Sequence, residues 1–177
     1  MGTRPVGFNV RALFALKSDR LYRVYAMPDG LYLIRIGGQG GLDGQTLALG
    51  AGGGALGVLI GSLLGAGGRG GGDKKAAAAD EQGPLTQLGH HKHDLRVRLD
   101  EILECSIEPP SRMPSHGPQA ARWLLTTRDE KWNLQFETNE DVVIALDHLP
   151  RVLGSRLKIS IVWSPTAGKY VGTGAGA

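Results

Sequence analysis

The chain has 177 residues, 41% of them hydrophobic and 21% charged, so it can bury a core and is too apolar for wholesale disorder. A formal charge of +3 and a pI near 9.2 fall short of a nucleic-acid-binding protein, and basic residues do not interleave with aromatic ones. A single cysteine, Cys105, excludes an internal disulfide and fits a reducing compartment.

The N-terminal residues carry arginines but neither the continuous apolar core nor the small-residue cleavage site of a secretory signal, which predicts a cytoplasmic protein. Residues 21–37, LYRVYAMPDGLYLIRIG, then predict a hairpin, because proline and glycine favour a turn between two β-rich runs. In the second run both alternating faces are largely apolar. We therefore expect this strand to be covered on both sides.

Residues 38–89 interrupt this regular pattern as a glycine-rich, apolar insertion. Its end, GRGGGDKKAAAADEQGP, has the composition of a flexible, charged linker. Regular structure returns with a half-buried strand over 95–99, and a further strand over 102–108 follows a bend at residues 100–101. Residues 111–119 are expected to form a loop.

The last third of the chain predicts a second hairpin, a helix and a strand. Residues 121–138 form the hairpin, with two tryptophans as large apolar anchors. Residues 139–153 form the helix, with Asn139 as its cap, Pro150 ending or kinking it and Gly154 near its C-cap. One strand is expected over 156–163, and a disordered tail over 165–177.

This order of elements resembles the pleckstrin-homology-like barrels of bacteria, including the GRAM-like group. The resemblance rests on the hairpin LYRVYAMPDGLYLIRIG, the strand pair RVRLDEILECSIE, and WNLQFETNEDVVIALDHLPRVLG as a last strand leading into a closing helix. It implies an α+β fold: a small antiparallel β-barrel or sandwich closed by the C-terminal helix, with a glycine-rich helical insertion. The barrel would comprise residues 1–37, with the first hairpin, and residues 90–164.

The resemblance also implies a binding module, because such barrels mainly bind partners. In some of them, lysines and arginines around the first hairpin loop hold phosphoinositide phosphates. Here the loop at residues 27–30 is acidic, which favours a purely structural turn.

Other candidate chemistry is sparse. The run HHKHD offers His90, His91 and His93 as metal ligands, but adjacent imidazoles are also common as solvated polar residues. Further ligands would have to come from Cys105, His116 or His148, and the spacing does not bring these together. Whether the histidines bind metal stays open.

We expect no enzyme, no cofactor and no small-molecule substrate. The sequence has no nucleophile elbow, phosphate loop or dinucleotide fingerprint. Cys105 lies in an apolar strand pattern, which predicts a buried structural thiol.

The most distinctive feature is a ladder of glycines with apolar residues between them. A spacing of four places the glycines on one face of a helix, where another backbone could approach closely. The candidate interaction residues are Gly53, Gly57, Gly61, Gly65, Leu56, Ile60 and Leu64. A helix that is apolar all round must be buried, either on its own barrel, on a second copy of the chain or in lipid.

Residues 47–68 carry no charge and are long enough to span a bilayer. Their glycine content weakens that interpretation. If the first hairpin pairs with strands after residue 94, a single spanning helix is excluded, whereas a helical hairpin or inserted loop is not. The two leading hypotheses are a scaffolding module that packs on itself or on a protein partner, and a protein that associates with a membrane surface, aided by Arg69, Lys74 and Lys75.

Overall fold

A computed structural model describes residues 6–14, 19–38, 74–110 and 120–174. Eight strands form one sheet in the order β4-β3-β2-β1-β7-β6-β5-β8, and β9 and β10 form a separate pair. The strands are β1 (Phe8–Ala12), β2 (Arg20–Met27), β3 (Gly30–Gly38), β4 (Leu95–Arg98), β5 (Ile102–Glu108), β6 (Arg122–Thr127), β7 (Lys131–Phe136), β8 (Leu157–Ile159), β9 (Ile161–Ser164) and β10 (Lys169–Gly172). In the described residues, helices cover 74–82, α3 (Pro84–Gln87) and α4 (Asn139–Leu153), and η1 (Leu99–Glu101) and η2 (Gly154–Arg156) are 3₁₀ turns.

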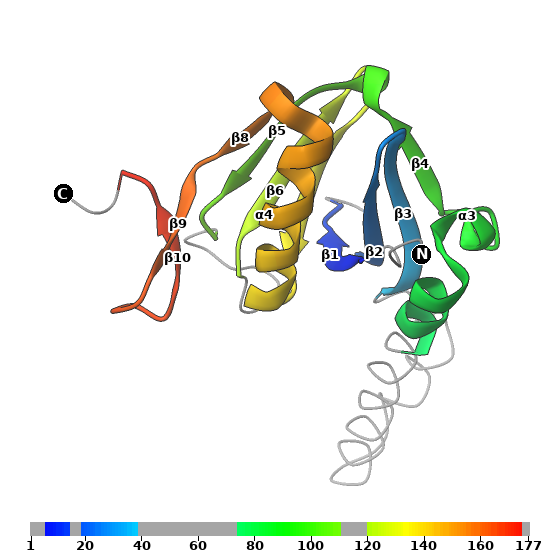
Figure 1. Ribbon diagram of the computed structural model, residues 1–177, viewed down its shortest axis with the longest axis horizontal. Coiled ribbons are helices and arrows are strands. Elements are labelled where there is room, and N and C mark those ends of the chain that lie inside the picture. Colours follow the sequence, from blue (N-terminus) through cyan, green and yellow to red (C-terminus); the bar gives the residue numbers. More distant parts are fainter. Residues whose placement is uncertain (1–5, 15–18, 39–73, 111–119, 175–177) are drawn as a thin grey trace, which may run out of the picture.

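The sheet is strongly curled. Strands β4 and β5 stand far apart in the sheet order, yet only the three residues of η1 join them. Three residues span at most about 10 Å, so the sheet must bend until these two strand ends meet. Figure 1 shows the two halves converging at this corner and diverging below it. The predicted α+β class is therefore confirmed, with an open, mostly antiparallel sheet; closure into a small barrel is not.

Helix α4 lies in the opening between the two halves (Figure 1). Its residues Val142, Ala145, Leu149 and Leu153 recur every three or four positions, and their buried side chains join the main core. The predicted bounds of this helix, 139–153, are confirmed.

The two ends of α4 differ in detail from the prediction. Thr138, not Asn139, is the N-cap: its side-chain oxygen accepts a hydrogen bond from the Asp141 N–H at 3.1 Å. Pro150 does not end the helix, which continues to Leu153, and Gly154 follows at the C-cap with a φ of 53°.

A strand missing from the prediction begins the sheet. In β1, Phe8, Val10 and Ala12 are buried and alternate with partly exposed neighbours, the pattern of a half-covered strand. Strand β1 pairs with both β2 and β7, so it joins the two halves. The hairpin over residues 21–37 is accordingly β2–β3, the second in the sheet rather than the first.

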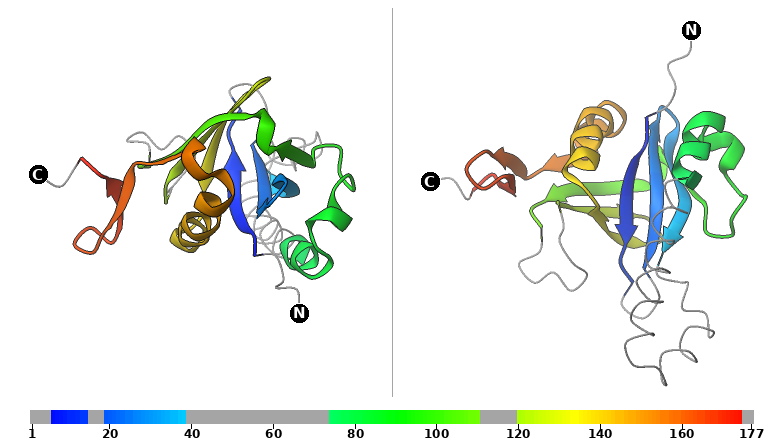
Figure 2. Two further views of the ribbon diagram at one scale, coloured as in Figure 1. Left: turned by 45° about the horizontal axis from the view of Figure 1, so that its top comes forward. Right: turned by 90° about the horizontal axis from the view of Figure 1, so that it is seen from below.

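The second face of β2–β3 is covered by a helical segment, residues 74–88, which contains the helix over 74–82 and α3. Ala79, Tyr25, Tyr32 and Ile34 are buried together there. The view from below in Figure 2 places this segment and α4 on opposite sides of β1–β3. The predicted two-sided burial of β3 is confirmed. The prediction of a flexible linker is wrong for residues 74–84, because an alanine-rich run readily forms a helix when it can pack on an apolar surface.

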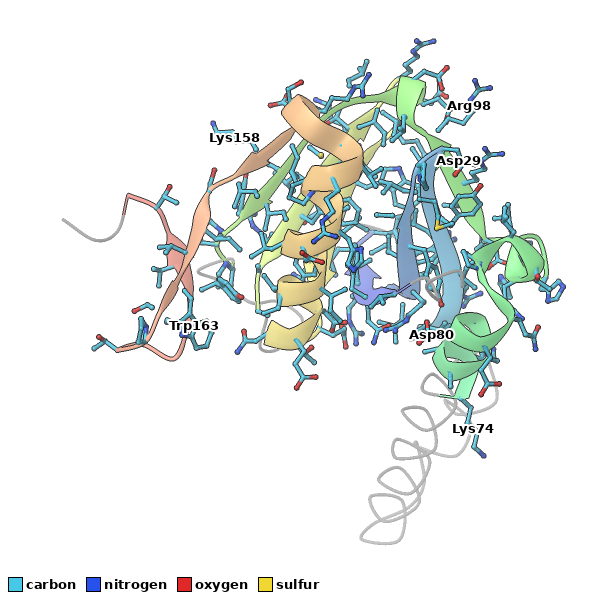
Figure 3. All side chains as sticks on the ribbon, in the orientation of Figure 1. Asp29, Lys74, Asp80, Arg98, Lys158 and Trp163 are labelled. Atoms are coloured by element: carbon cyan, nitrogen blue, oxygen red, sulfur yellow. The ribbon has the colours of Figure 1, made fainter. Side chains whose placement is uncertain are left out.

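The end of the chain is also more regular than predicted. The single strand expected over 156–163 is divided into β8, which runs parallel to β5, and β9. Residues 165–174 are not a disordered tail, because β10 pairs with β9 in a hairpin that projects from the body of the protein (Figure 1). Trp163 lies on this hairpin (Figure 3), 43% exposed and in edge contact with Tyr170.

Candidate functional site

A pocket of about 200 Å³ lies where the helical segment 74–88 meets the end of β3. Ile34 and Ile36 of β3 supply apolar lining, together with Ala78 of the helix. The polar lining comes from three separate parts of the chain and consists of Arg35, Lys75, Gln87, His90, His91 and Asp94. The pocket therefore combines an apolar floor with side chains that are mostly cationic or can become so.

Asp94 holds the pocket in shape. One of its carboxylate oxygens accepts the Arg35 backbone N–H at 2.9 Å, and the other accepts the His91 backbone N–H at 2.7 Å. The Asp94 N–H donates in turn to the His91 carbonyl at 2.9 Å. These bonds tie the turn at residues 91–94 to β3, and they use both carboxylate oxygens on backbone donors.

The Arg35 guanidinium contacts neutral groups. Its Nη1 lies 3.0 Å from His91 Nε2, and its Nε donates to the Gly37 carbonyl at 3.4 Å. Neither partner supplies a negative charge. The other nitrogen of the His91 ring, Nδ1, lies 3.2 Å from the His93 backbone N–H.

Burial and the neighbouring positive charges lower the pKa values of His91 and His93. Partial burial, followed by the positive charge of Arg35, lowers the pKa of His91 below its ordinary value, although Asp94 opposes the shift. Burial and the charges of Arg20 and Arg35 likewise lower the pKa of His93. Both rings are therefore predominantly neutral at pH 7.

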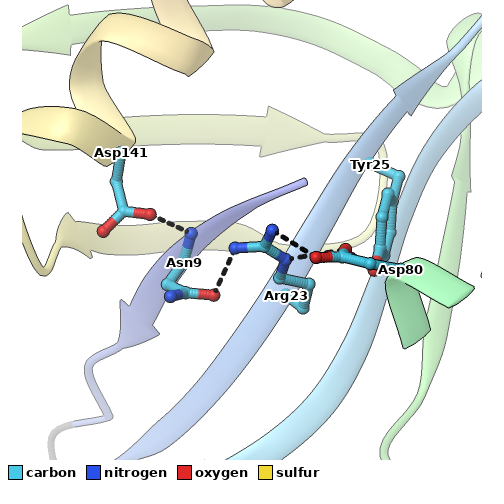
Figure 4. Close-up of polar contacts among 5 residues, drawn as sticks. All are labelled: Asn9, Arg23, Tyr25, Asp80 and Asp141. Atoms are coloured by element: carbon cyan, nitrogen blue, oxygen red, sulfur yellow. Dashed lines mark hydrogen bonds and ion pairs between the residues drawn. The ribbon is translucent and has the colours of Figure 1, made fainter. Parts of the chain in front are cut away.

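A chain of polar contacts anchors the helical segment on the sheet (Figure 4). Arg23 of β2 donates to both carboxylate oxygens of Asp80, at 3.2 and 2.8 Å, and the Tyr25 hydroxyl donates to the same carboxylate at 2.6 Å. Arg23 also donates to the side-chain oxygen of Asn9 at 3.1 Å, and the Asn9 backbone N–H donates to Asp141 of α4 at 2.6 Å. The network thus runs from α4 through β1 and β2 to the wall of the pocket.

The predicted interaction residues lie outside the described residues. This holds for the whole glycine ladder, Gly53, Gly57, Gly61 and Gly65, and for Leu56, Ile60 and Leu64. In the described part of the chain, β3, which ends at Gly38, pairs directly with β4. The pairing of the hairpin with a strand after residue 94 is therefore confirmed.

Three of the candidate metal ligands lie near one another: His90 and His91 line the pocket, and the His93 ring lies beside that of His91, with centroids 5.4 Å apart. The proposed further ligands are elsewhere: Cys105 is in the main core, His148 is on α4, and His116 lies outside the described part. In the ranges that the structure describes, no three His, Cys, Asp or Glu side chains are grouped as a metal site requires. Cys105 is a buried thiol, as predicted: burial raises its pKa to about 11, and Sγ contacts the Arg156 carbonyl at 3.5 Å.

The acidic turn at residues 27–30 is occupied by structural contacts. The Asp29 carboxylate accepts hydrogen bonds from the Tyr32 hydroxyl at 2.7 Å and from Arg96 at 2.6 Å. The Tyr32 bond, with the nearby charge of Arg96, lowers the pKa of Asp29. Asp29 therefore joins the turn to β3 and β4 as an acceptor.

The pocket itself was missed in the sequence. His91 and Arg35 are 56 residues apart, and no spacing rule joins them. One signal was present: Arg35 interrupts the otherwise apolar run LYLIRIG, and a cation in a strand covered on both faces needs a specific surrounding.

In the described parts of the chain, no helix is long and apolar enough to cross a membrane. No protein-family model matches the sequence, and a search of curated proteins finds no match.

Proposed function

We propose that this chain is a non-catalytic binding or scaffolding module on a pleckstrin-homology-like sheet, and that the glycine-ladder segment mediates self-association. Support for the PH-like assignment comes from the chain order of the elements. An antiparallel β1–β4 meander continues through one short corner into a β5–β7 meander, and a helix follows β7 and fills the opening. These are the elements on which the resemblance rests, with β1 now added at the start.

One observation carries the scaffolding role: in the sequence, residues 39–73 lie between β3, which is inside the sheet, and the helical segment, which packs on that sheet. Upstream, β3 is held between β2 and β4. Downstream, the part-buried Arg23–Asp80 ion pair, at 2.8 Å, fixes the described helical segment on β2. A segment fixed at both ends loses less conformational entropy on binding than a free tail, which favours its use as a recognition element.

Light scattering on the purified full-length chain tests this proposal. We expect an oligomer that becomes a monomer when residues 45–72 are replaced by a short glycine-serine linker. We expect Gly61→Leu to weaken the oligomer, because a leucine on the glycine face separates the helices, and Ser62→Leu to serve as a control off that face. A monomer in both the full-length and the shortened chain refutes self-association.

A second candidate, association with an anionic membrane surface, is favoured by charge. Lys74, labelled in Figure 3, and Lys75 are exposed on the helical segment that follows residues 39–73 in the sequence. Lys75 and Arg35 both line the pocket. Each basic residue near an anionic bilayer contributes about 1 kcal/mol. Co-sedimentation with phosphatidylserine vesicles that decreases in a Lys74→Gln, Lys75→Gln variant supports it, and full recovery in the supernatant refutes it.

A further inference from the structure

We propose that the pocket between β3 and the helical segment binds a phosphate-type oxyanion, either inorganic phosphate or a phosphate monoester, through Arg35, His91 and Lys75. This site is independent of the self-association proposed above, because it consists of described residues outside the glycine ladder. It is also distinct from the acidic turn at residues 27–30, which lies at the other end of the β2–β3 hairpin.

The charges around the pocket favour an anion. Arg35 comes from β3, Lys75 from the helix over 74–82, and His90 and His91 from the turn after α3. Lys92 adds positive charge near His91 and His93, and Arg20 adds positive charge near His93; these charges help to lower the pKa of each ring. The acidic group in the lining is Asp94, and both of its oxygens already accept backbone N–H bonds.

Hydrogen bonding around His91 gives an independent argument. Its Nε2 faces a guanidinium donor and its Nδ1 faces a backbone N–H. A neutral imidazole has only one acceptor nitrogen, so at least one of these contacts places two donors against each other. An oxyanion that accepts from both Arg35 Nη1 and His91 Nε2 removes the conflict, because these two groups then donate to the anion while Nδ1 accepts from His93.

The size of the pocket and its apolar lining also fit a phosphate-type oxyanion. A cavity of about 200 Å³ is several times the space that one water molecule needs, so it has room for a tetrahedral oxyanion with some of its water. The isoleucines of β3 make the floor apolar, and a lower local dielectric strengthens charge-assisted hydrogen bonds. Arginine is suited to such a ligand because its planar fork of donors matches phosphate oxygens.

A phosphate titration followed by NMR of the histidine side chains tests the proposal on the full-length chain. We expect saturable binding with a Kd of about 1 mM. The bound anion should shift His91 to the Nε2-protonated tautomer and raise its pKa, because the anion offsets the Arg35 and Lys75 charges that now lower it.

Charge-removing variants with matched controls identify the site. Arg35→Gln should weaken binding at least tenfold and Lys75→Gln severalfold. Arg98→Gln and Lys158→Gln, which remove exposed charges at the sheet corner and on β8, should leave it unchanged (Figure 3). Lys75 is exposed, so its variant keeps the test valid if Arg35→Gln does not fold.

Three probes distinguish the source of the phosphate: inorganic phosphate, glycerol 3-phosphate, and vesicles containing phosphatidic acid. Binding of either soluble probe that depends on Arg35 supports a free anion or monoester. Arg35-dependent binding to the vesicles alone supports the same chemistry with a lipid-borne phosphate. The proposal is overturned if none of the three binds, or if the Arg35→Gln and Arg98→Gln proteins bind equally well.

Discussion

Asp80 is expected to be the residue that keeps the helical segment docked on the sheet. Its carboxylate accepts two hydrogen bonds from Arg23 and one from the Tyr25 hydroxyl, and the side chains of Arg23 and Asp80 are 14% and 37% exposed. Hydrogen bonds to a charged group contribute about 1.5–3 kcal/mol when buried, and partial exposure reduces this. Asp80→Asn keeps the shape but removes the charge, so we expect docking to weaken by about 2 kcal/mol.

Hydrogen exchange measures this loss locally, because the segment can detach without unfolding the core. A loss of about 2 kcal/mol corresponds to roughly 30-fold faster exchange of the amides within residues 76–82. Asp100→Asn is the control, since the Arg98–Asp100 pair at 3.0 Å has side chains 62% and 59% exposed, and such a pair contributes less than about 1 kcal/mol. Exchange within twofold of wild type in Asp80→Asn would refute the anchoring role.

Three further predictions concern the core and the cap. Trp123 is fully buried against Phe8, with ring centroids 5.8 Å apart, so Trp123→Ala should lower the urea unfolding free energy by about 3–5 kcal/mol; a loss below about 1 kcal/mol would contradict this packing. Thr138→Ala removes the N-cap of α4 and should cost about 1 kcal/mol in the same assay, whereas the exposed Thr86 on α3 should tolerate alanine with little change. Folding raises the pKa of the Cys105 thiol from 9.0 to about 11, so the fold favours its protonated form; this contribution is complete below pH 9 and is lost as the pH rises to about 11. Urea titrations at pH about 8 and about 10.5 should therefore differ more in wild type than in Cys105→Ala, and equal differences would contradict it.

The sequence pattern was sufficient to predict an element wherever that element depends on neighbouring residues alone. The bounds of α4 followed from apolar spacing and a glycine C-cap, and β5 and the β6–β7 hairpin followed from alternation and turn residues. The two apolar faces of β3 even indicated that an unseen element had to cover it. The same reasoning missed β1, although Phe8, Val10 and Ala12 alternate correctly, because five residues are a short window for such a pattern.

The errors share a physical cause, which is that the deciding contacts lie far apart in the chain. The run of alanines after Lys75 is helical because Ala79 finds an apolar surface on β2–β3, and Asp80 finds Arg23 57 residues earlier. The last strand is divided because β8 pairs with β5, whereas β9 pairs with β10. Local composition does not indicate which distant segment each of these residues will contact.

The sequence by itself therefore determined the class of the fold, the position of its C-terminal helix and the burial of Cys105, because periodicity and polarity act locally. Only the tertiary structure decided that the sheet curls open around α4, and that Arg35, Lys75 and His91 surround one pocket. Those residues belong to three segments, and their proximity arises from pairing and packing over tens of residues. Basic residues that are spread along the sequence form a candidate anion site because the fold brings them to one pocket.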